Sequence, residues 1–381
     1  MHSSQADEHT QIKHAGSLRG LPVSIKLVSC QDWAPDSPSL QAAVRAAALR
    51  HPNLHEVYEF RAAILDAQDV ERLAPLPMLR PGWPLRPAGR LHRILTGGPP
   101  QAQLGVGSLT VYPGDMQPLP PPPELQQQQQ QQQPDAPRDT GCWRQLRARM
   151  SAVRLVPGGH VVAVIGELCG EGTLADRSRA AGSPFKPGRS RDLPAAQRAL
   201  LGTAREVASA LAALHAAGIA HGGLHPASVL LVASSADGRG FSARLADVGS
   251  PSLAHAAAHP AAAGPCLLWL APEALYDEAG AASPAADVYG FGLLLYVMAA
   301  GEMPFEGMGL APSLIAMASC AIVRPEWPTG HHDHLEPLFR DCTATDPGQR
   351  PSAAQVTERL CRLEAAAGGA SWRDGLQGAA P

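Results

Sequence analysis

Aromatic side chains are scarce in this sequence of 381 residues. Trp, Tyr and Phe together make up 4% of it, although hydrophobic residues make up 45%. The apolar mass is therefore mostly Ala, Leu and Val, which favours Ala-rich helices over a fold made of strands alone. A chain of this length suffices for one large domain or two modest ones with a sizeable core.

A surplus of basic charge is also missing. The chain has 31 Lys and Arg against 34 Asp and Glu, a formal net charge of −3. We therefore expect no nucleic acid and no anionic membrane surface as a main partner. Its seven Cys are odd in number, are never closer than 19 positions and form no CxxC pair. A disulfide framework or a thiolate metal site is therefore not expected.

Long apolar segments are absent as well. The first residues, MHSSQADEHTQIKHAG, lack the apolar core of a signal peptide. The most apolar run near the C-terminus, Gly290–Gly301, is too short to cross a bilayer. We therefore expect a soluble, intracellular protein, located in the cytoplasm, without a membrane partner.

The first half of the chain contains an ordered stretch and then a long polar one. Ser24–Val28 and His55–Leu65 are strand-like, and Ser39–His51 has the apolar spacing of a helix. Residues 66–150 contain Pro-rich pieces and eight consecutive glutamines, Gln126–Gln133. Such a segment cannot bury enough surface to offset its chain entropy, so it predicts a disordered insertion. The glutamine run is interpreted as a neutral loop expansion, with self-association as the alternative.

Order is expected to resume at Val153–Leu168, where two β-rich runs flank Pro157-Gly158-Gly159 as in a hairpin. A polar loop, 178–191, precedes a helix that begins near Pro194 and ends at Gly218. The rest of the chain has the pattern of helices and loops.

Eight short motifs follow one another along the chain, each of them weak alone. In order they are VSIK (Val23–Lys26), HPNL (His51–Leu54), VIGELCGEGTL (Val164–Leu174), HGGLHPASVLL (His221–Leu231), Asp247-Val248-Gly249, Ala271-Pro272-Glu273, DVYGFG (Asp287–Gly292) and QRPSAAQV (Gln349–Val356). Their order and spacing resemble those of the eukaryotic protein kinase family. The resemblance covers about Leu18–Arg362. The residues of RGLPVSIK and HPNL are most similar to those of the tyrosine-kinase-like serine/threonine branch.

The resemblance implies a two-lobed α+β fold. A small antiparallel-β N-lobe that lacks its first strand or two would span residues 17–169, including the insertion at 66–150. A mainly α-helical C-lobe would span residues 170–366. We expect the ends, residues 1–16 and 367–381, to be disordered.

The family's nucleotide site maps onto six positions, with ATP and Mg²⁺ as the implied cofactors. Lys26 matches the lysine that grips the α- and β-phosphates, and Asp247 matches the aspartate that holds Mg²⁺. A solvated lysine and a loop-capping aspartate are the alternatives. Glu167 and Cys169 match the hinge that contacts adenine. Gly166 matches the gatekeeper behind adenine, and Leu230 matches the residue on the purine face. A plain core leucine accounts equally well for Leu230.

The residues that maintain the family's fold are present. Glu273 and Arg350 match a carboxylate–guanidinium pair that ties the activation segment to the C-lobe. Asp287 matches the aspartate that binds the backbone of the catalytic loop, and His221 matches a histidine of the internal packing spine.

The residues that perform the family's chemistry are not intact. Gly222 replaces an arginine, Gly223 the catalytic aspartate, His225 a lysine, and Ser228 the metal-binding asparagine. Ala42, next to Gln41, stands where the glutamate partner of Lys26 is expected, and Val248 replaces a phenylalanine. No Gly-rich phosphate loop is visible, so it is either absent or precedes this sequence. We interpret His225 as no substitute base.

We therefore predict a pseudokinase that works through protein partners, either with residual ATP binding or without it. The alternatives are a weakly active serine/threonine kinase and a degraded gene product. The cluster GHHDH, Gly330–His334, is interpreted as a solvated turn, with a Zn²⁺ site as the alternative. Ser250 and Ser252 are the only hydroxyl side chains between Gly249 and Glu273, so we do not expect control by phosphorylation of this activation segment. The sequence does not indicate an oligomeric state.

Overall fold

The computed structural model describes residues 11–18, 20–29, 38–64, 108–111, 160–188, 192–249, 268–275, 282–308, 310–319 and 324–377. The chain divides into two compact units, of residues 1–37 with 57–167 and of residues 38–56 with 168–381. We call them the sheet unit and the helical unit. They confirm the expected α+β architecture, with an antiparallel sheet in one unit and mainly helices in the other.

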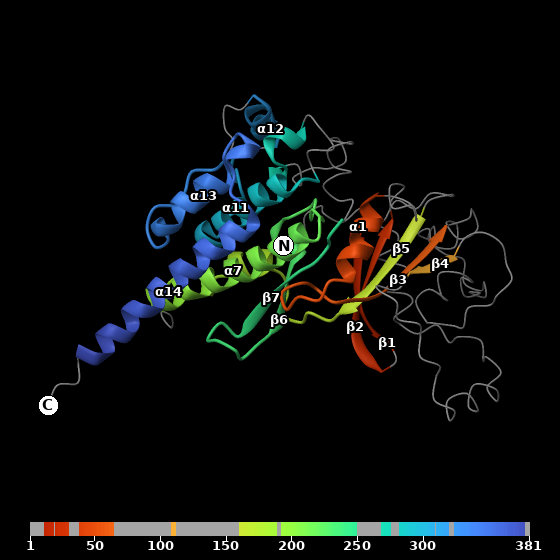
Figure 1. The fold of residues 1–381 in the computed structure, drawn as a ribbon, viewed down its shortest axis with the longest axis horizontal. Coiled ribbons are helices and arrows are strands. Elements are labelled where there is room, and N and C mark those ends of the chain that lie inside the picture. Colours follow the sequence, from red (N-terminus) through yellow and green to blue (C-terminus); the bar gives the residue numbers. More distant parts are fainter. Residues whose placement is uncertain are drawn as a thin grey trace, which may run out of the picture. The chain divides into compact units, whose positions relative to one another are not determined.

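In the described part of the sheet unit, five antiparallel strands follow the order β1-β2-β5-β3-β4 (Figure 1). Their bounds are β1 Gln11–Leu18, β2 Leu21–Ser29, β3 Val57–Ile64, β4 Ser108–Val111 and β5 His160–Glu167. The strands expected near Ser24–Val28 and His55–Leu65 are thereby confirmed. β5 lies between β2 and β3 because its run HVVAVIGE is apolar on both faces, as a central strand requires.

Three expectations about order differ from the structure. Residues 11–16, expected to be disordered, belong to β1, because β2 gives every residue of that strand a pairing partner. β4 falls within the expected insertion and pairs with the edge of β3. The last helix runs to Gln377, past the expected boundary at 366. The glutamine run, Val153–Val156 and the serines of the activation segment lie outside the described residues.

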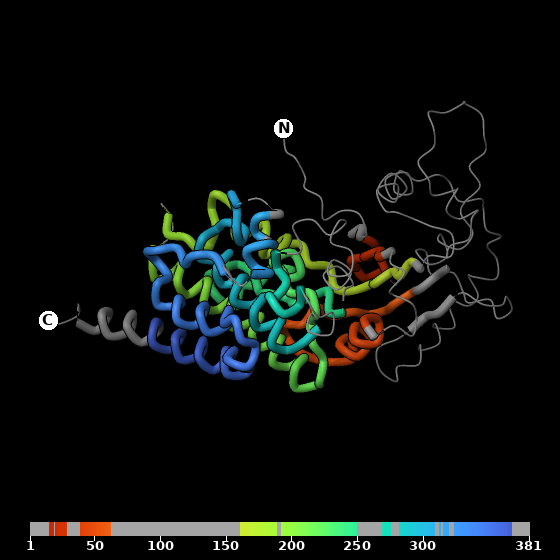
Figure 2. The backbone as a smooth tube through the Cα atoms, turned by 90° about the horizontal axis from the view of Figure 1, so that it is seen from above, coloured from red at the N-terminus to blue at the C-terminus, as the bar shows by residue number. Residues whose placement is uncertain are grey.

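Within the described residues, the helical unit is built from α-helices, short 3₁₀ helices and a two-stranded hairpin. Figure 2 shows the helices as coils of the backbone tube. The α-helices are α1 Pro38–Ala47, α6 Leu174–Arg179, α7 Leu193–Ala216, α11 Pro284–Ala300, α12 Leu310–Ala318, α13 Glu336–Cys342 and α14 Ala353–Gln377. The hairpin is β6 Val229–Ala233 with β7 Phe241–Leu245, and the 3₁₀ helices are η1 Pro226–Ser228, η3 Pro272–Leu275, η4 Asp333–Leu335 and η5 Pro347–Gln349. Among the described helices none has both the length and the hydropathy to span a membrane.

Helices α7 and α11 contribute many of the core residues of this unit. α7 begins at the cap Asp192, whose carboxylate accepts a hydrogen bond from Ala195 N at 2.8 Å, and α14 packs along it (Figure 1). α11 begins at the cap Ser283 and is buried along almost its whole length. Because α11 is apolar all round, it lies in the interior and holds Asp287 rigidly near its first turn.

The segment Pro38–Glu56, expected in the N-lobe, belongs to the helical unit. Its loop joins β7 through three hydrogen bonds, from Leu245 N to Asn53 O (2.7 Å), from His55 N to Leu245 O (2.9 Å) and from Asn53 Nδ2 to Ala243 O (3.1 Å). These bonds continue the β6–β7 hairpin by a parallel bridge between Leu54 and Leu245. The segment Pro38–Glu56 is therefore joined to the helical unit by hydrogen bonds between residues about 190 positions apart in the sequence.

Candidate functional site

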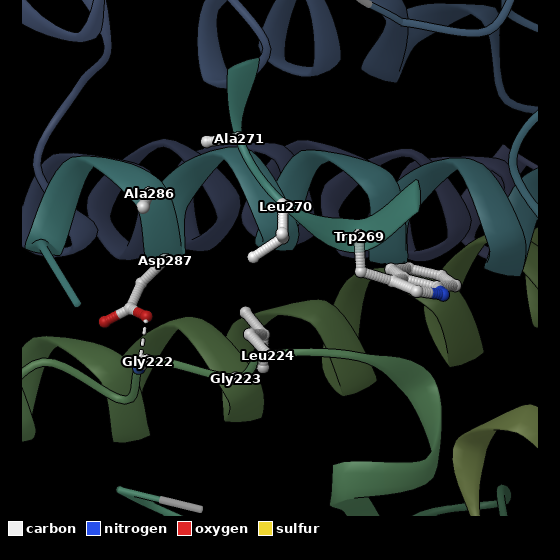
Figure 3. Close-up of a pocket in the computed structure, with 8 residues that line it drawn as sticks. All are labelled: Gly222, Gly223, Leu224, Trp269, Leu270, Ala271, Ala286 and Asp287. Carbon is white, nitrogen blue, oxygen red and sulfur yellow. Dashed lines mark hydrogen bonds between the residues drawn. The ribbon is translucent and has the colours of Figure 1, made fainter. Parts of the chain in front are cut away.

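The loop that begins at His221 is held by one buried carboxylate. Asp287, which is 2% exposed, accepts hydrogen bonds from the backbone N–H groups of His221 (2.7 Å) and Gly222 (2.9 Å). It also accepts one from Nε2 of His215 at 2.8 Å. Figure 3 shows the bond to Gly222. Charge-assisted bonds of this kind are short and directional, so the backbone of the loop is fixed to α11.

His221 joins this loop to the segment that carries Asp247. Its Nδ1 accepts a hydrogen bond from Gly223 N (3.2 Å), and its Nε2 donates one to Ala246 O (2.8 Å). Burial lowers the pKa of His221, although the nearby Asp287 opposes this effect. Gly249 N donates to His221 O at 3.0 Å. The imidazole is therefore a neutral bridge with both nitrogens bonded.

The side chains of His225 and Ser228 both bond to the backbone of the loop and cap the same short helix, η1. Nδ1 of His225 accepts a hydrogen bond from Ala227 N at 3.1 Å and so caps η1. The Ser228 hydroxyl donates to His225 O (2.7 Å) and accepts from His225 N (3.1 Å). Ser228 is 0% exposed. Its hydroxyl is thus committed to a capping box.

A small pocket lies beside the loop. Gly222, Gly223 and Leu224 line one side, and Asp287 and Ala286 line another (Figure 3). The segment Trp269–Ala271, just before η3, completes the lining. Position 223 is a glycine, so it contributes only backbone to this lining.

Asp247 has an unusual backbone conformation. Its φ is +67°, in the left-handed region that few residues other than glycine adopt, and Gly249 has φ +66°. The neighbouring Ala246 N donates to Ser228 O at 2.8 Å, which ties this turn to the loop. Val248 packs against the core of the helical unit. A backbone conformation of this kind persists only where the surrounding structure holds it in place. Such residues are common at functional sites.

The other expected nucleotide positions are divided between the units. Lys26 on β2 lies opposite Val164 on β5, and Gly166 lies opposite Ser24, whose hydroxyl donates to Glu167 O at 2.9 Å. These three positions, Lys26, Gly166 and Glu167, therefore share one sheet. Cys169, Leu230 and Asp247 belong to the helical unit, where Leu230 is half-buried on β6.

Glu273 and Arg350 form a bidentate ion pair. Nη1 and Nη2 of Arg350 donate to the two carboxylate oxygens at 2.6 and 2.8 Å. The guanidinium also donates to Ala285 O (3.0 Å) and Ala344 O (2.9 Å), and it lies 5.2 Å from the ring centre of Tyr289. Its side chain is 0% exposed and that of Glu273 23%. The pair therefore connects η3, α11 and the segment before α14.

Two structural groups were not predicted from the sequence. The first is His215, whose position in the last turn of a helix that leads to His221 was an available signal. The second is a buried network in which Arg239 donates to Glu206 (2.5 Å), while Glu206 accepts from Ala243 N (2.8 Å). Burial opposes the charge of Arg239, but its hydrogen bonds to Asp237 and Glu206 outweigh burial and raise its pKa.

The histidine cluster Gly330–His334 forms no metal site among the described residues, where no group of three metal-ligating side chains was found. His332 is buried, and its Nε2 donates to Phe185 O at 2.7 Å. This bond fastens the loop between α6 and α7. The segment is thus partly buried rather than the fully solvated turn that was expected.

Comparison with known proteins identifies the family. A family model described as "Protein tyrosine and serine/threonine kinase" matches residues 128–360, more than half of the chain. Serine/threonine-protein kinase PkaA of Streptomyces coelicolor is 34% identical over 160 residues, which are 41% of this chain and 27% of that protein.

Mitogen-activated protein kinase kinase kinase 11 of Homo sapiens is 31% identical over 122 residues, 32% of this chain and 14% of that protein. The Raf homolog serine/threonine-protein kinase of Caenorhabditis elegans is 28% identical over 98 residues, 25% of this chain and 12% of that protein. The matches thus cover less than a third of these relatives. Together with the fold and the loop geometry, they show that the chain belongs to the protein tyrosine and serine/threonine kinase family.

Proposed function

We propose that this kinase domain has lost phosphoryl transfer and acts as a pseudokinase through contacts with protein partners. The observation that carries the proposal is the loop from His221 to Ser228. Its backbone is fixed by Asp287, yet Gly223 offers no carboxylate and the Ser228 hydroxyl is buried in a cap. The loop therefore retains its position while lacking the groups that react.

The missing carboxylate has a large energetic effect. A positioned general base contributes about 10²–10⁴-fold to a rate, which is about 3–5 kcal/mol of activation free energy. The buried Ser228 hydroxyl, which donates to His225 O and accepts from the His225 N–H, is also a poor replacement for a metal-binding amide. The two losses act on different parts of the reaction, proton removal and metal binding.

His225 does not replace the base. A backbone N–H always donates, so Nδ1 of His225, which accepts from Ala227 N, carries no proton in this arrangement. The neutral ring then has its proton on Nε2. If Nδ1 took a substrate proton, its hydrogen bond from Ala227 N would break. If Nε2 took the proton, the ring would first need the tautomer with its proton on Nδ1, and that tautomer breaks the same hydrogen bond.

Residual binding of ATP with Mg²⁺ is part of the proposal. Lys26 would contact the phosphates and Asp247 would hold the metal, while Gly166, Glu167, Cys169 and Leu230 would surround the base. The strained φ of Asp247 supports this role. The proposal places the chain in the cytoplasm, where nucleotide and protein partners are both available.

Thermal stability measured with and without ATP, each with and without Mg²⁺, tests nucleotide binding. A ligand that binds only the folded state at 100-fold its Kd adds about 2.7 kcal/mol to stability. We expect a Mg²⁺-dependent rise in Tm that Lys26→Ala and Asp247→Ala remove. No rise at millimolar ATP would contradict residual binding and leave the scaffold role alone.

A weakly active serine/threonine kinase is the second candidate. Two observations favour it, the retained left-handed turn at Asp247 and relatives that are named serine/threonine-protein kinases. In that case phosphate transfer to a generic protein substrate should be measurable, should vanish in Asp247→Asn and should increase in Gly223→Asp. If the chain is a pseudokinase, we expect no phosphate transfer by the wild-type chain, by Asp247→Asn or by Gly223→Asp.

A further inference from the structure

Helix α1 is packed as an apolar part of the helical unit. Ala42, where the family has a glutamate, packs against the core of this unit, as do Leu49 and Val248. Ala46, one turn after Ala42, is itself buried in the same core. Residues 42, 46 and 49 lie on one face of a helix and its continuation, so this face is directed at the helical core.

A charged side chain on α1 caps another helix. Nη2 of Arg45 donates to Ala217 O at 3.0 Å and approaches Gly218 O at 3.5 Å. These carbonyls follow the last turn of α7, where backbone oxygens have no partner within their own helix. A cation is also favoured there by the negative end of the helix dipole. Arg45 therefore fastens α1 to the C-terminal end of α7.

The opposite contact of α1 is with the turn that carries Asp247. A Cβ atom added at Gly249 would lie against Ser39 O, well inside van der Waals contact, and 3.1 Å from Ala43 N. The turn is thus in direct contact with the backbone of α1. On its other side, Gly249 N donates to His221 O at 3.0 Å. The Asp247–Gly249 turn is therefore enclosed between α1 and the loop at His221.

We propose that Arg45 is a positioning residue: it locks α1 onto α7, and α1 in turn holds the Asp247–Gly249 turn in its strained conformation. Three contacts in series form this lock, from Ala217 O to Arg45, from α1 to Gly249 and from Gly249 to His221. The lock consists only of residues of the helical unit, so it operates without any contribution from Lys26. Its relevance to Mg²⁺ binding by Asp247 rests on the proposed function.

Hydrogen exchange of the full chain, followed by mass spectrometry, tests the lock. In Arg45→Ala we expect amides of α1 and of Asp247–Gly249 to exchange about three- to tenfold faster, because charged hydrogen bonds of this kind stabilise local structure. Exchange in α13 should not change. Arg45→Lys should restore part of the protection, since its ammonium can still donate to Ala217 O.

Arg50→Ala is the matched control. Arg50 follows α1, and its ion pair with Glu56 is exposed, with side-chain exposures of 71% and 46%. We expect this variant to leave exchange at Asp247–Gly249 unchanged. Equal effects of Arg45→Ala and Arg50→Ala, or an effect of Arg45→Ala confined to α1, would overturn the lock.

Gly249→Ala perturbs the same contact from the other side. Its added Cβ would displace α1, so α1 amides should exchange faster although Arg45 is intact. Unchanged exchange in α1 would contradict the proposed contact. None of these measurements needs nucleotide. A chain that fails to bind ATP would therefore contradict the proposed residual binding of nucleotide, while the exchange data would still decide the lock.

Discussion

Replacing Arg350 with methionine should lower the free energy of unfolding by about 3–5 kcal/mol, the cost of breaking a buried ion pair by removing one partner. The guanidinium makes four hydrogen bonds, two to Glu273 and one each to Ala285 O and Ala344 O. Methionine fills much of the volume but satisfies none of these acceptors. Because the Glu273 side chain is 23% exposed, water can reach its carboxylate, and we expect a value near the lower end.

The assay is urea unfolding followed by circular dichroism, on Arg350→Met, Glu273→Leu and the double variant. Each single variant leaves one charged group without its partner, the buried Arg350 or the partly exposed Glu273, whereas the double variant leaves neither. We therefore expect the double variant to lose about 2–3 kcal/mol less than the sum of the two single losses.

Arg340→Ala provides the control for this prediction. Arg340 forms an exposed pair with Glu336 one turn away on the same helix, with side-chain exposures of 59% and 35%. Such pairs contribute about 0.3–0.5 kcal/mol. The reasoning would be refuted if Arg350→Met cost no more than Arg340→Ala, or if the two single losses were additive.

Three further predictions concern stability. Burial lowers the pKa of His332, so below pH about 6.5 the unfolded chain binds more protons than the folded one, and the free energy of unfolding should fall as pH drops. Urea unfolding at pH 7.5 and 5.5 should show a smaller difference in this free energy for His332→Gln than for the wild-type chain. The same difference in both proteins would contradict the prediction. Gly292→Ala should cost about 1–3 kcal/mol, since a Cβ there would lie 2.6 Å from Thr343 Cγ2, whereas Gly238→Ala meets nothing within 4 Å and should stay within about 0.5 kcal/mol. Asp192→Ala removes the cap of α7 and should lower the midpoint of thermal unfolding by an amount that corresponds to about 1 kcal/mol; an unchanged midpoint would show that the cap contributes nothing.

The sequence predicted those parts of the molecule that depend on local pattern. The long helix α7 follows from its apolar spacing and from Pro194 and Gly218 at its ends, and β5 follows from its uninterrupted apolar run. The motif order indicated the α+β kinase fold. The roles expected for Asp287 and Arg350 came from the resemblance of their motifs to those of the kinase family.

The contacts between distant segments could not be predicted in this way. β1 exists because β2 pairs with it, and no pattern within residues 11–18 requires that partner. The contacts of α1 and the loop after it include the bond from Arg45 to Ala217 O, which joins residues 172 positions apart, and the pairing of Leu54 with Leu245. Likewise, the residue types at 225 and 228 do not reveal that the two side chains cap the same short helix. Such facts depend on where the backbone brings groups together.

We propose that the loop from His221 to Ser228 is held in place but does not react. The most direct test measures transfer of the labelled γ-phosphate of ATP, with Mg²⁺ or Mn²⁺, to a generic protein substrate and to the chain itself. The wild-type chain and Asp247→Asn are assayed side by side at equal concentration. The account predicts that the two give the same background level. Transfer by the wild-type chain that exceeds this background and disappears in Asp247→Asn would contradict it.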